Sequence, residues 1–412
     1  MPWKVTDPMC QRAKFVALHD EGLFSMAELC RRFGVSRNTG YKWLARYERG
    51  GVESLKDQSR APLTCPHQTA TPVEQALLQA RREHPTWGPK KLLAYLERRR
   101  PNLAARLPAP STVGEILKAG GLSQPRKRPA RRWKHPGAVP LRADAPNQVW
   151  CADFKGQFPT QDGQDCYPLT VTDAHSRFLL CCHALPSVRQ EGALPVFERV
   201  FAEFGLPQAI RTDNGVPFAT QAICGLSKLS VWWIKLGIAH QRIEPGQPQQ
   251  NGRHERMHKT LKRETARPPQ RDHQAQQARF DAFRSEFNSE RPHEALGQNT
   301  PASLYSPSPR PLPKTLPEPA YPGHFLVRLV SKSSMFRLHH RPVFISEALI
   351  GECIGLEETG DGIWSLYFYD VLLGRLDERD YKRSGVKSTQ SVTHVPGLNC
   401  QPSTRPLQSG GT

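Results

Sequence analysis

"QVWCADFKGQFPTQDGQDCYPLTVTDAHSRFLLCCHAL", residues 148–185, decides the fold of the central part of the chain. Its stretches "QVWCADFKGQF" and "CYPLTVTDAHSRFLLCCHAL" alternate or run apolar, and they are rich in the β-branched and aromatic residues that strands favour. "PTQDGQD" and "TDAHSR" carry turn residues. We therefore predict an antiparallel meander of three strands.

The residues after the meander change their hydrophobic period. "GALPVFERVFAEFG" (192–205) predicts an amphipathic helix, and "QAIRTD" (208–213) predicts a short buried strand. A meander followed by a helix and a parallel strand is typical of an α/β domain with helices on a mixed sheet.

The N-terminal segment has the pattern of a helix-turn-helix. "SMAELCRRFGVSRNTGYKWLARY" (25–47) holds two short helical patterns on either side of a Gly-Val-Ser turn, with Ser36 as the predicted N-cap of the second helix. That helix would present basic and polar side chains to a DNA groove, namely Arg37, Asn38, Thr39 and Lys42. An ordinary helical hairpin is the alternative.

Residues 72–122 carry further helical stripes and indicate a second winged or helix-turn-helix module. The stretch that follows, "SQPRKRPARRWKHPGAVPLRADAPN" (123–147), is too rich in proline and charge to bury a core. We interpret it as a basic linker that can follow DNA phosphates; a plain solvated tether is the alternative. Its candidate DNA-binding residues are Arg126, Lys127, Arg128, Arg131 and Arg132.

The C-terminal part begins with a second proline-rich stretch, "SPSPRPLPKTLPEPAYPG" (306–323). Residues 324–382 then carry several short apolar strands with turns between them, which favours a small β-barrel. Residues 386–412 are expected to be disordered.

Composition points to a polyanionic partner. The 412 residues include 57 Lys and Arg against 38 Asp and Glu, for a net charge of +19. Nucleic acid is the commonest partner of so basic a chain, although charge can also serve solubility alone. Ten cysteines without a C-x-x-C pair predict a reduced, cytoplasmic protein, and no long apolar run predicts a secretion signal or a membrane span.

Three acidic residues fall where a mixed sheet would gather them. Asp153 and Asp213 end predicted strands, and Glu255 lies on a helix with Asn251 as a possible N-cap. Three converging carboxylates would repel one another unless cations lay between them. Mg²⁺ or Mn²⁺ is the natural occupant of such a site.

These residues lie in stretches that resemble the DDE transposases of bacterial insertion sequences and their retroviral integrase relatives. The matching stretches are "VWCADFKG", "RTDNGVPFAT" and "GIAHQRIEPGQPQQNGRHERMHKTLKRE". The resemblance implies a ribonuclease-H-like core in which Asp153, Asp213 and Glu255 form the catalytic triad and hold two Mg²⁺ ions, with Mn²⁺ as a substitute. The 41 residues between Asp213 and Glu255 exceed the usual spacing of the family, which implies a longer intervening loop or helix.

The resemblance also implies roles for neighbouring residues. Lys259 and Lys262 follow Glu255 on the same helical face and would contact the DNA backbone; a solvated basic face is the alternative. Gly215 is expected to serve the turn after Asp213. Asn214 would either orient a metal ligand or cap that turn.

The predicted fold class is thus multidomain, with N-terminal all-α helix-turn-helix modules, an α/β ribonuclease-H-like catalytic core and a C-terminal small β-barrel. The predicted segments are a helix-turn-helix DNA-binding domain (1–62), a second helical DNA-binding domain (63–122), the basic linker (123–147), the integrase catalytic core (148–306), a proline-rich linker (307–322), the barrel (323–385) and a disordered tail (386–412). The expected function is a transposase that binds the inverted repeats of its element as a homo-multimer on double-stranded DNA, cleaves 3′ ends and transfers strands. Such a protein would work on the nucleoid in the cytoplasm.

The same helix also matches a zinc-peptidase signature, H-E-x-x-H, at His254-Glu255-Arg256-Met257-His258. However, His254, Met257, His258 and Leu261 form the stripe that a helix buries. We therefore expect core histidines rather than zinc ligands. The remaining alternatives are a DNA-binding regulator or inactive transposase relative, and a nuclease that cleaves without strand transfer.

Overall fold

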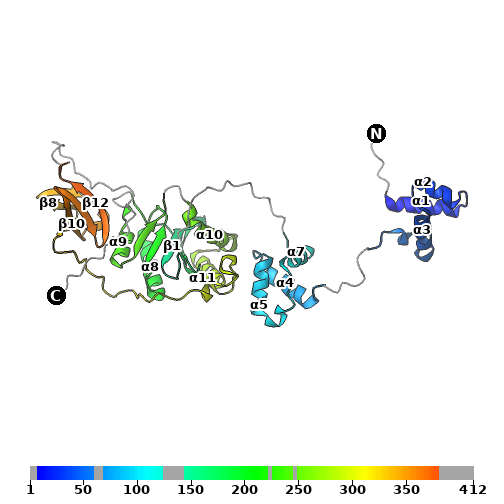
Figure 1. Cartoon of the computed structure of the whole chain (residues 1–412), viewed down its shortest axis with the longest axis horizontal. Coiled ribbons are helices and arrows are strands. Elements are labelled where there is room, and N and C mark those ends of the chain that lie inside the picture. Colours follow the sequence, from blue (N-terminus) through cyan, green and yellow to red (C-terminus); the bar gives the residue numbers. More distant parts are fainter. Residues whose placement is uncertain (1–6, 60–67, 124–142, 221–224, 245–247, 380–412) are drawn as a thin grey trace. The chain divides into compact units, whose positions relative to one another are not determined.

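The computed structural model describes residues 7–59, 68–123, 143–220, 225–244 and 248–379 (Figure 1). The predicted linker residues Arg126, Lys127, Arg128, Arg131 and Arg132 and the predicted tail at 386–412 lie outside these ranges. The chain divides into two compact units, residues 1–68 and 69–412, and each is described by itself. Within the described ranges no helix combines the length and the apolar character that crossing a bilayer requires.

The first unit is a small helical domain. Its elements are α1 (Pro8–Asp20), α2 (Met26–Phe33), α3 (Arg37–Gly50) and the 3₁₀ helix η1 (Val52–Leu55). Ser25 and Glu28 form a reciprocal capping box at the start of α2, and the Ser36 hydroxyl caps α3 by accepting from the Thr39 backbone N–H. Gly34, with φ +66°, ends α2, as the helix-turn-helix prediction requires. Gly40 allows the close packing of the helices, because a Cβ there would lie 2.9 Å from the Phe15 ring.

The second unit begins with another helical bundle. Its helices are α4 (Thr71–Glu83), α5 (Pro89–Arg99), α6 (Pro101–Ala104) and α7 (Pro110–Ala119). Their apolar stripes meet in one core around the fully buried Trp87, with Leu77, Leu92 and Val113. The expected helical module at 72–122 is therefore present.

A six-stranded mixed sheet follows. Its strands are β1 (Val149–Phe154), β2 (Phe158–Pro159), β3 (Asp165–Asp173), β4 (Leu179–Leu185), β5 (Ala209–Thr212) and β6 (Ala239–Arg242). β1, β3 and β4 form the predicted antiparallel meander, with β2 as a short addition to the edge of β3. β5 and β6 then extend the sheet from β1 in parallel.

Helices cover both faces of this sheet (Figure 1). They are α8 (Gln190–Phe204), α9 (Lys228–Lys235), α10 (Gly252–Thr265) and α11 (His273–Ser289). Because side chains alternate along a strand, Trp150 and Ala152 face the core that includes α8 and α9. Cys151 and Asp153 face the opposite way, toward α10. α10 and α11 pack their Met257, Leu261 and Phe280 side chains on that second face.

The predicted proline-rich linker packs on the sheet domain. Two backbone hydrogen bonds attach it to the end of α8, since the Ser308 N–H donates to the Phe204 carbonyl and the Leu206 N–H donates to the Arg310 carbonyl. The Arg310 guanidinium also donates to the carbonyls of Pro207, Leu236 and Gly237. Sequence composition alone did not indicate this attachment.

The C-terminal strands form two open sheets around one core. Strands β7 (Leu326–Leu329), β10 (Cys353–Gly360), β11 (Ile363–Phe368) and β12 (Val371–Asp377) make one sheet, and β8 (Met335–Leu338) and β9 (Arg341–Phe344) make the other. The β structure of this region was predicted, but among the described strands no pairing closes it into a barrel. The shared core also takes Val231 and Ile234 from α9, so this region packs on the sheet domain.

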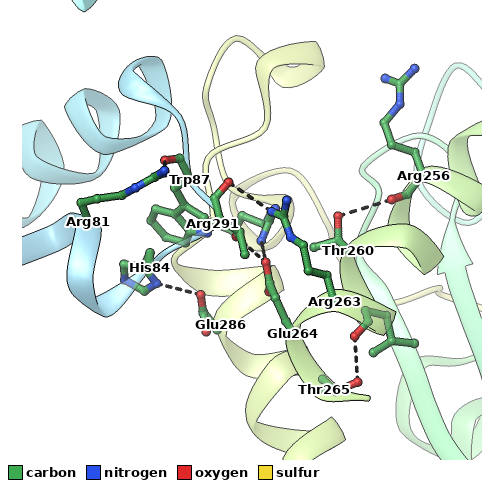
Figure 2. A network of polar contacts seen from close by, with 12 residues as sticks. Arg81, His84, Trp87, Arg256, Thr260, Arg263, Glu264, Thr265, Glu286 and Arg291 are labelled. Atoms are coloured by element: carbon green, nitrogen blue, oxygen red, sulfur yellow. Dashed lines mark hydrogen bonds and ion pairs between the residues drawn. The ribbon is translucent and has the colours of Figure 1, made fainter. Parts of the chain in front are cut away.

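The helical bundle at 69–122 contacts α10 and α11 through polar groups (Figure 2). Thr86 donates to Glu264 at 2.5 Å, and His84 Nδ1 lies 2.9 Å from Glu286. Glu264 also accepts from Arg291 at 2.9 Å, and both side chains of this ion pair are nearly buried. A buried pair of this kind fixes geometry more than it adds stability, because losing one partner leaves the other charge unpaired.

His240 gives the sheet domain a predicted sensitivity to acid. It is 5% exposed on β6, and burial, with a smaller effect of Arg242, lowers its pKa to about 3. Below about pH 6.5 the unfolded chain gains a proton that the folded chain does not, so stability should fall as pH falls. The expected loss at pH 5 is about 2 kcal/mol for this residue.

The variant His240→Gln should narrow the difference between the melting temperatures at pH 8 and pH 5, measured by scanning calorimetry of the full chain. His340→Gln, at an exposed position, serves as the control and should keep the wild-type difference. An unchanged difference in His240→Gln would contradict a neutral buried His240.

Candidate active site

The sheet register brings two of the predicted acids to one edge. Asp153 lies at the end of β1, and Asp213 follows β5 directly. β1 and β5 run parallel with Cys151 opposite Arg211, so the aspartates two residues later on both strands reach the same end of the sheet. Glu255 lies in the first turn of α10, which covers this face.

Electrostatics shows that the three carboxylates are close enough to influence one another. The pKa of Asp153 is raised to about 7, first by burial, then by Asp213 and, to a smaller extent, by Glu255. The backbone N–H of Phe154 and the charge of Lys155 oppose this shift only in part. A carboxylate in this position gains from a cation that replaces the lost water and cancels the repulsion.

Asn251 completes the cluster. It stands at the N-cap position predicted for α10, but its side chain makes no capping bond. Instead its amide Nδ2 donates to Asp153 Oδ2 at 3.2 Å. Its buried Oδ1 has no hydrogen-bond partner within the described residues. An orphan amide oxygen next to the Asp153 carboxylate offers the oxygen ligands that hard cations such as Mg²⁺ and Mn²⁺ prefer, so these residues fit such an ion.

The turn after Asp213 is braced by its own residues. The Gly215 backbone N–H donates to Asp213 Oδ1 at 3.1 Å, and a Cβ on Gly215 would lie 3.2 Å from Asp213 Oδ2. The Asn214 amide donates to the Ile243 carbonyl at 2.9 Å. This bond ties the turn after Asp213 to the residue that follows β6, and the two roles considered for Asn214 stay predictions.

The two histidines of the zinc-peptidase signature turn toward β3. His254 Nε2 and His258 Nε2 both lie 2.7 Å from Thr170 Oγ1, and His254 Nδ1 lies 2.8 Å from Thr172 Oγ1. Thr170 Oγ1 also lies 3.0 Å from the Asp153 carbonyl, to which it donates. Both Nε2–H groups then donate to Thr170, and the Thr172 hydroxyl donates to His254 Nδ1.

These bonds use both ring nitrogens of His254. Asp153, His254 and His258 do bring ligand atoms within 4.8 Å of one another, but a metal there would have to break the threonine bonds of His254. Burial lowers the pKa of His254 to about 3 and that of His258 still further, so both rings are neutral. The prediction of core histidines is consistent with this packing. Their role is to seat α10 on the sheet.

The predicted DNA-contacting residues divide into several sets. Lys259 and Lys262 are exposed on α10 beyond Glu255. In the first unit Arg37, Asn38 and Lys42 are exposed along α3. Thr39 is half-buried at the start of α3, and its hydroxyl lies 2.9 Å from Ser36 Oγ.

Comparison with known protein families identifies four matching regions. Residues 143–248 and 236–301 match models described as integrase core domain. Residues 11–62 match a helix-turn-helix domain and residues 39–117 a homeodomain-like domain. The integrase match spans the sheet with all three carboxylates, and the other two lie over the helical parts.

Individual relatives come from retroviruses and bacterial insertion elements. The chain is 34% identical over 132 residues to the Gag-Pol polyprotein of baboon endogenous virus, covering 31% of this chain and 7% of the polyprotein. It is 25% identical over 239 residues to an uncharacterised protein of insertion element IS476 from Xanthomonas euvesicatoria, covering 57% of this chain and 66% of that protein. The chain thus spans less than two thirds of these relatives.

Among solved structures, the HTLV-2 integrase catalytic core in complex with magnesium aligns with 15% identity and a TM-score of 0.30. The alignment covers 40% of this chain and 99% of that one.

Asp153→Asn tests the raised pKa of this carboxyl group, which burial causes first and Asp213 second. Because the folded pKa of Asp153 is raised, its ionisation costs stability as pH rises from about 4 to about 7. The uncharged variant should therefore be more stable than wild type in metal-free buffer, and the gain should be about 3 kcal/mol larger at pH 8 than at pH 5.

Calorimetric melting temperatures at the two pH values give the measurement, with the exposed Asp370→Asn as control. Added Mg²⁺ should raise the melting temperature of wild type and of Asp370→Asn but not of Asp153→Asn. A gain that does not depend on pH would contradict the raised pKa of Asp153.

Proposed function

We propose that this chain, which carries an integrase core over residues 143–301 together with helix-turn-helix domains and so fits the DDE transposases of bacterial insertion sequences, is a DNA transposase. It binds the terminal inverted repeats of its element, cleaves their 3′ ends and transfers them to target DNA. The observation that supports this most is the convergence of Asp153, Asp213 and Glu255 at the end of β1, with the pKa of Asp153 raised by burial and by the other two acids.

In this proposal Asp153, Asp213 and Glu255 hold two Mg²⁺ ions, with Mn²⁺ as a substitute. When bound, such a pair supplies activation of the attacking oxygen and stabilisation of the leaving oxygen in an in-line displacement. Asn251 orients Asp153 through its bond to Oδ2, and Asn214 and Gly215 hold the Asp213 turn. Lys259 and Lys262 contact phosphates of the bound strand.

The reaction runs in two displacements on phosphorus. Water attacks the phosphodiester at the element end, which breaks the bond to the 3′ oxygen and frees a 3′-hydroxyl. That hydroxyl then attacks a phosphodiester of the target, forming one new bond and releasing one 3′-hydroxyl of the target strand. No covalent bond to the protein is needed, because each step exchanges one oxygen for another.

DNA recognition is assigned to the helical parts. The N-terminal domain (1–62) would insert α3 into the major groove, with Arg37 and Asn38 at base edges and Lys42 near phosphate. The second helical domain (63–122) and the linker arginines would extend the contact along the DNA. The core (148–306) and a C-terminal β-barrel-like domain (323–385) complete the proposed organisation, and pairing of two element ends calls for a homo-multimer on DNA in the cytoplasm.

A non-catalytic DNA-binding regulator is the second candidate. It accounts for the helix-turn-helix domains but gives no reason to keep three repelling carboxylates in a partly buried cluster. A zinc peptidase has less support, because both ring nitrogens of His254 are already hydrogen-bonded.

Strand transfer with Glu255→Gln tests the catalytic proposal. Purified full-length protein, Mg²⁺ and a labelled duplex with the terminal sequence of the element should give nicked and joined products with wild type. The variant keeps the size of the side chain but loses a metal-binding charge, so product formation should fall by about a hundredfold or more while DNA affinity stays unchanged.

Glu198→Gln, exposed on α8, is the matched control and should retain wild-type activity. Equal DNA binding without nicking or joining by any of the proteins, in Mg²⁺ or Mn²⁺, would favour the regulator instead.

The role of α3 is tested by Arg37→Gln. Loss of a contact to a base edge should weaken binding to the terminal repeat by about 1–3 kcal/mol, roughly tenfold or more, and should weaken binding to unrelated DNA less. Fluorescence anisotropy at one fixed salt concentration measures both. Arg49→Gln, at the exposed far end of α3, is the charge-matched control, and equal losses in the two variants would contradict base readout by Arg37.

A further inference from the structure

A cavity separate from the three catalytic candidates lies on the same face of the sheet. Its volume is about 120 Å³, and its walls come from β1, β3, β5, α10, the end of α11 and α5. Asn251 and His254 line it, and the same two residues contact Asp153 and Thr170. The side chains of Asn251 and His254 therefore lie between the cavity and the carboxylate cluster.

The lining is strongly basic. Six cationic side chains reach it: Lys91, Arg177, Arg211, Arg253, Arg256 and Arg291. Arg291 is paired with Glu264. The other five form no ion pair with any acid in the described part of the chain. The one acid in the lining, Asp173, is 1% exposed and already accepts from the Asn147 backbone N–H and from Ser176.

Two of these arginines have a buried Nε donor that is unused within the described ranges. Arg211 is buried as a whole residue, and Arg177 is half-buried. Arg211 is 4% exposed, and its Nη2 donates to Gln241, but its Nε has no partner among the residues described. Arg177 Nε is likewise buried without a partner in that part of the chain. Unpaired buried donors on guanidinium groups are costly, so an acceptor with negative charge would be bound favourably.

The cations also act on one another. Burial and then Arg291 lower the pKa of Lys91 to about 8, and burial, Arg253 and Arg256 lower the pKa of Arg177. Arg291 lies beside the ring of Trp87 and reaches Glu264, as Figure 2 shows. Contact with Trp87 of the helical bundle and with Glu264 of α10 thus positions Arg291.

The cavity is large enough for a small anion. Its volume of about 120 Å³ is several times the roughly 10–15 Å³ that one water needs. One tetrahedral anion fits, and arginine forks match its oxygens.

We propose that this cavity is a binding site for a single phosphate dianion, either inorganic phosphate or the terminal phosphate monoester at the 5′ end of a DNA strand. A phosphate monoester carries up to two negative charges and three acceptor oxygens, whereas a backbone diester carries one negative charge. The monoester therefore neutralises more of the excess positive charge in the cavity. The assignment of this phosphate to a DNA strand end at the carboxylates rests on the proposed function. The existence of the phosphate site does not depend on that function.

The test measures binding in metal-free buffer with EDTA, so that it does not depend on catalysis. Inorganic phosphate is titrated into the full-length protein by isothermal titration calorimetry. A 5′-phosphorylated dinucleotide and its 5′-hydroxyl counterpart, both too short for the helix-turn-helix domains, are then used as competitors. Saturable binding of inorganic phosphate with a stoichiometry of one is the expected result.

The competitors separate the two sources. Displacement by the 5′-phosphorylated dinucleotide alone assigns the site to a DNA end, whereas displacement by neither assigns it to free phosphate. Equal displacement by the 5′-hydroxyl dinucleotide, or no saturable binding of phosphate by wild type, would overturn the proposal. A protein that binds phosphate but fails in strand transfer would contradict the proposed function and leave this site standing.

Variants locate the binding. Arg177→Gln and the exposed Arg256→Gln should each weaken phosphate binding by about tenfold or more, as expected for loss of a charged hydrogen bond. Arg189→Gln removes the same charge from an exposed position outside the cavity and should bind as wild type does. Equal weakening by Arg189→Gln would mean diffuse attraction and would also overturn the proposal. If Arg177→Gln lost its fold by circular dichroism, Arg256→Gln alone would decide.

Discussion

The burial of Asp153 beside a second acid, Asp213, is the constraint on which the central domain depends. The parallel pairing of β1 with β5 places Asp153 and Asp213 at one end of the sheet, and α10 adds Glu255. Removing Asp153 from water raises its pKa to about 7, a cost that the fold bears unless cations are bound. Because ionised Asp153 is unfavourable without a cation, the site binds divalent ions more favourably. Two-metal nucleases and transferases need such binding.

The packing of α10 on the sheet fixes the position of Glu255 relative to the two aspartates. His254 and His258 lie on the buried side of the helix and hydrogen-bond to Thr170 and Thr172 of β3, while Glu255 lies on the exposed side. The neutral imidazole rings orient α10 through hydrogen bonds and add no charge beside Asp153. The zinc-peptidase signature in the sequence thus arises from two histidines that orient a helix.

The same sheet face separates acidic from basic groups. Carboxylates gather at the strand ends, and two residues earlier on β5 Arg211 belongs to the basic cavity. Asn251 and His254 stand between the two clusters. Placing a cation site and an anion site side by side would fix a strand end at two points, and fixing a reactant in this way lowers the entropic part of the barrier.

The sequence by itself determined the helix-turn-helix, the meander and the following helix and strand, because these follow from short-range periodicity and turn residues. It also predicted the three acids as a set from motif spacing. Tertiary structure decided the rest. The attachment of the proline-rich stretch through Arg310, the open sheets at the C-terminus and the position of Asn251 beside Asp153 all depend on contacts between distant segments. The basic cavity is the clearest case, since residues from 91 to 293 line it and only packing brings their charges together.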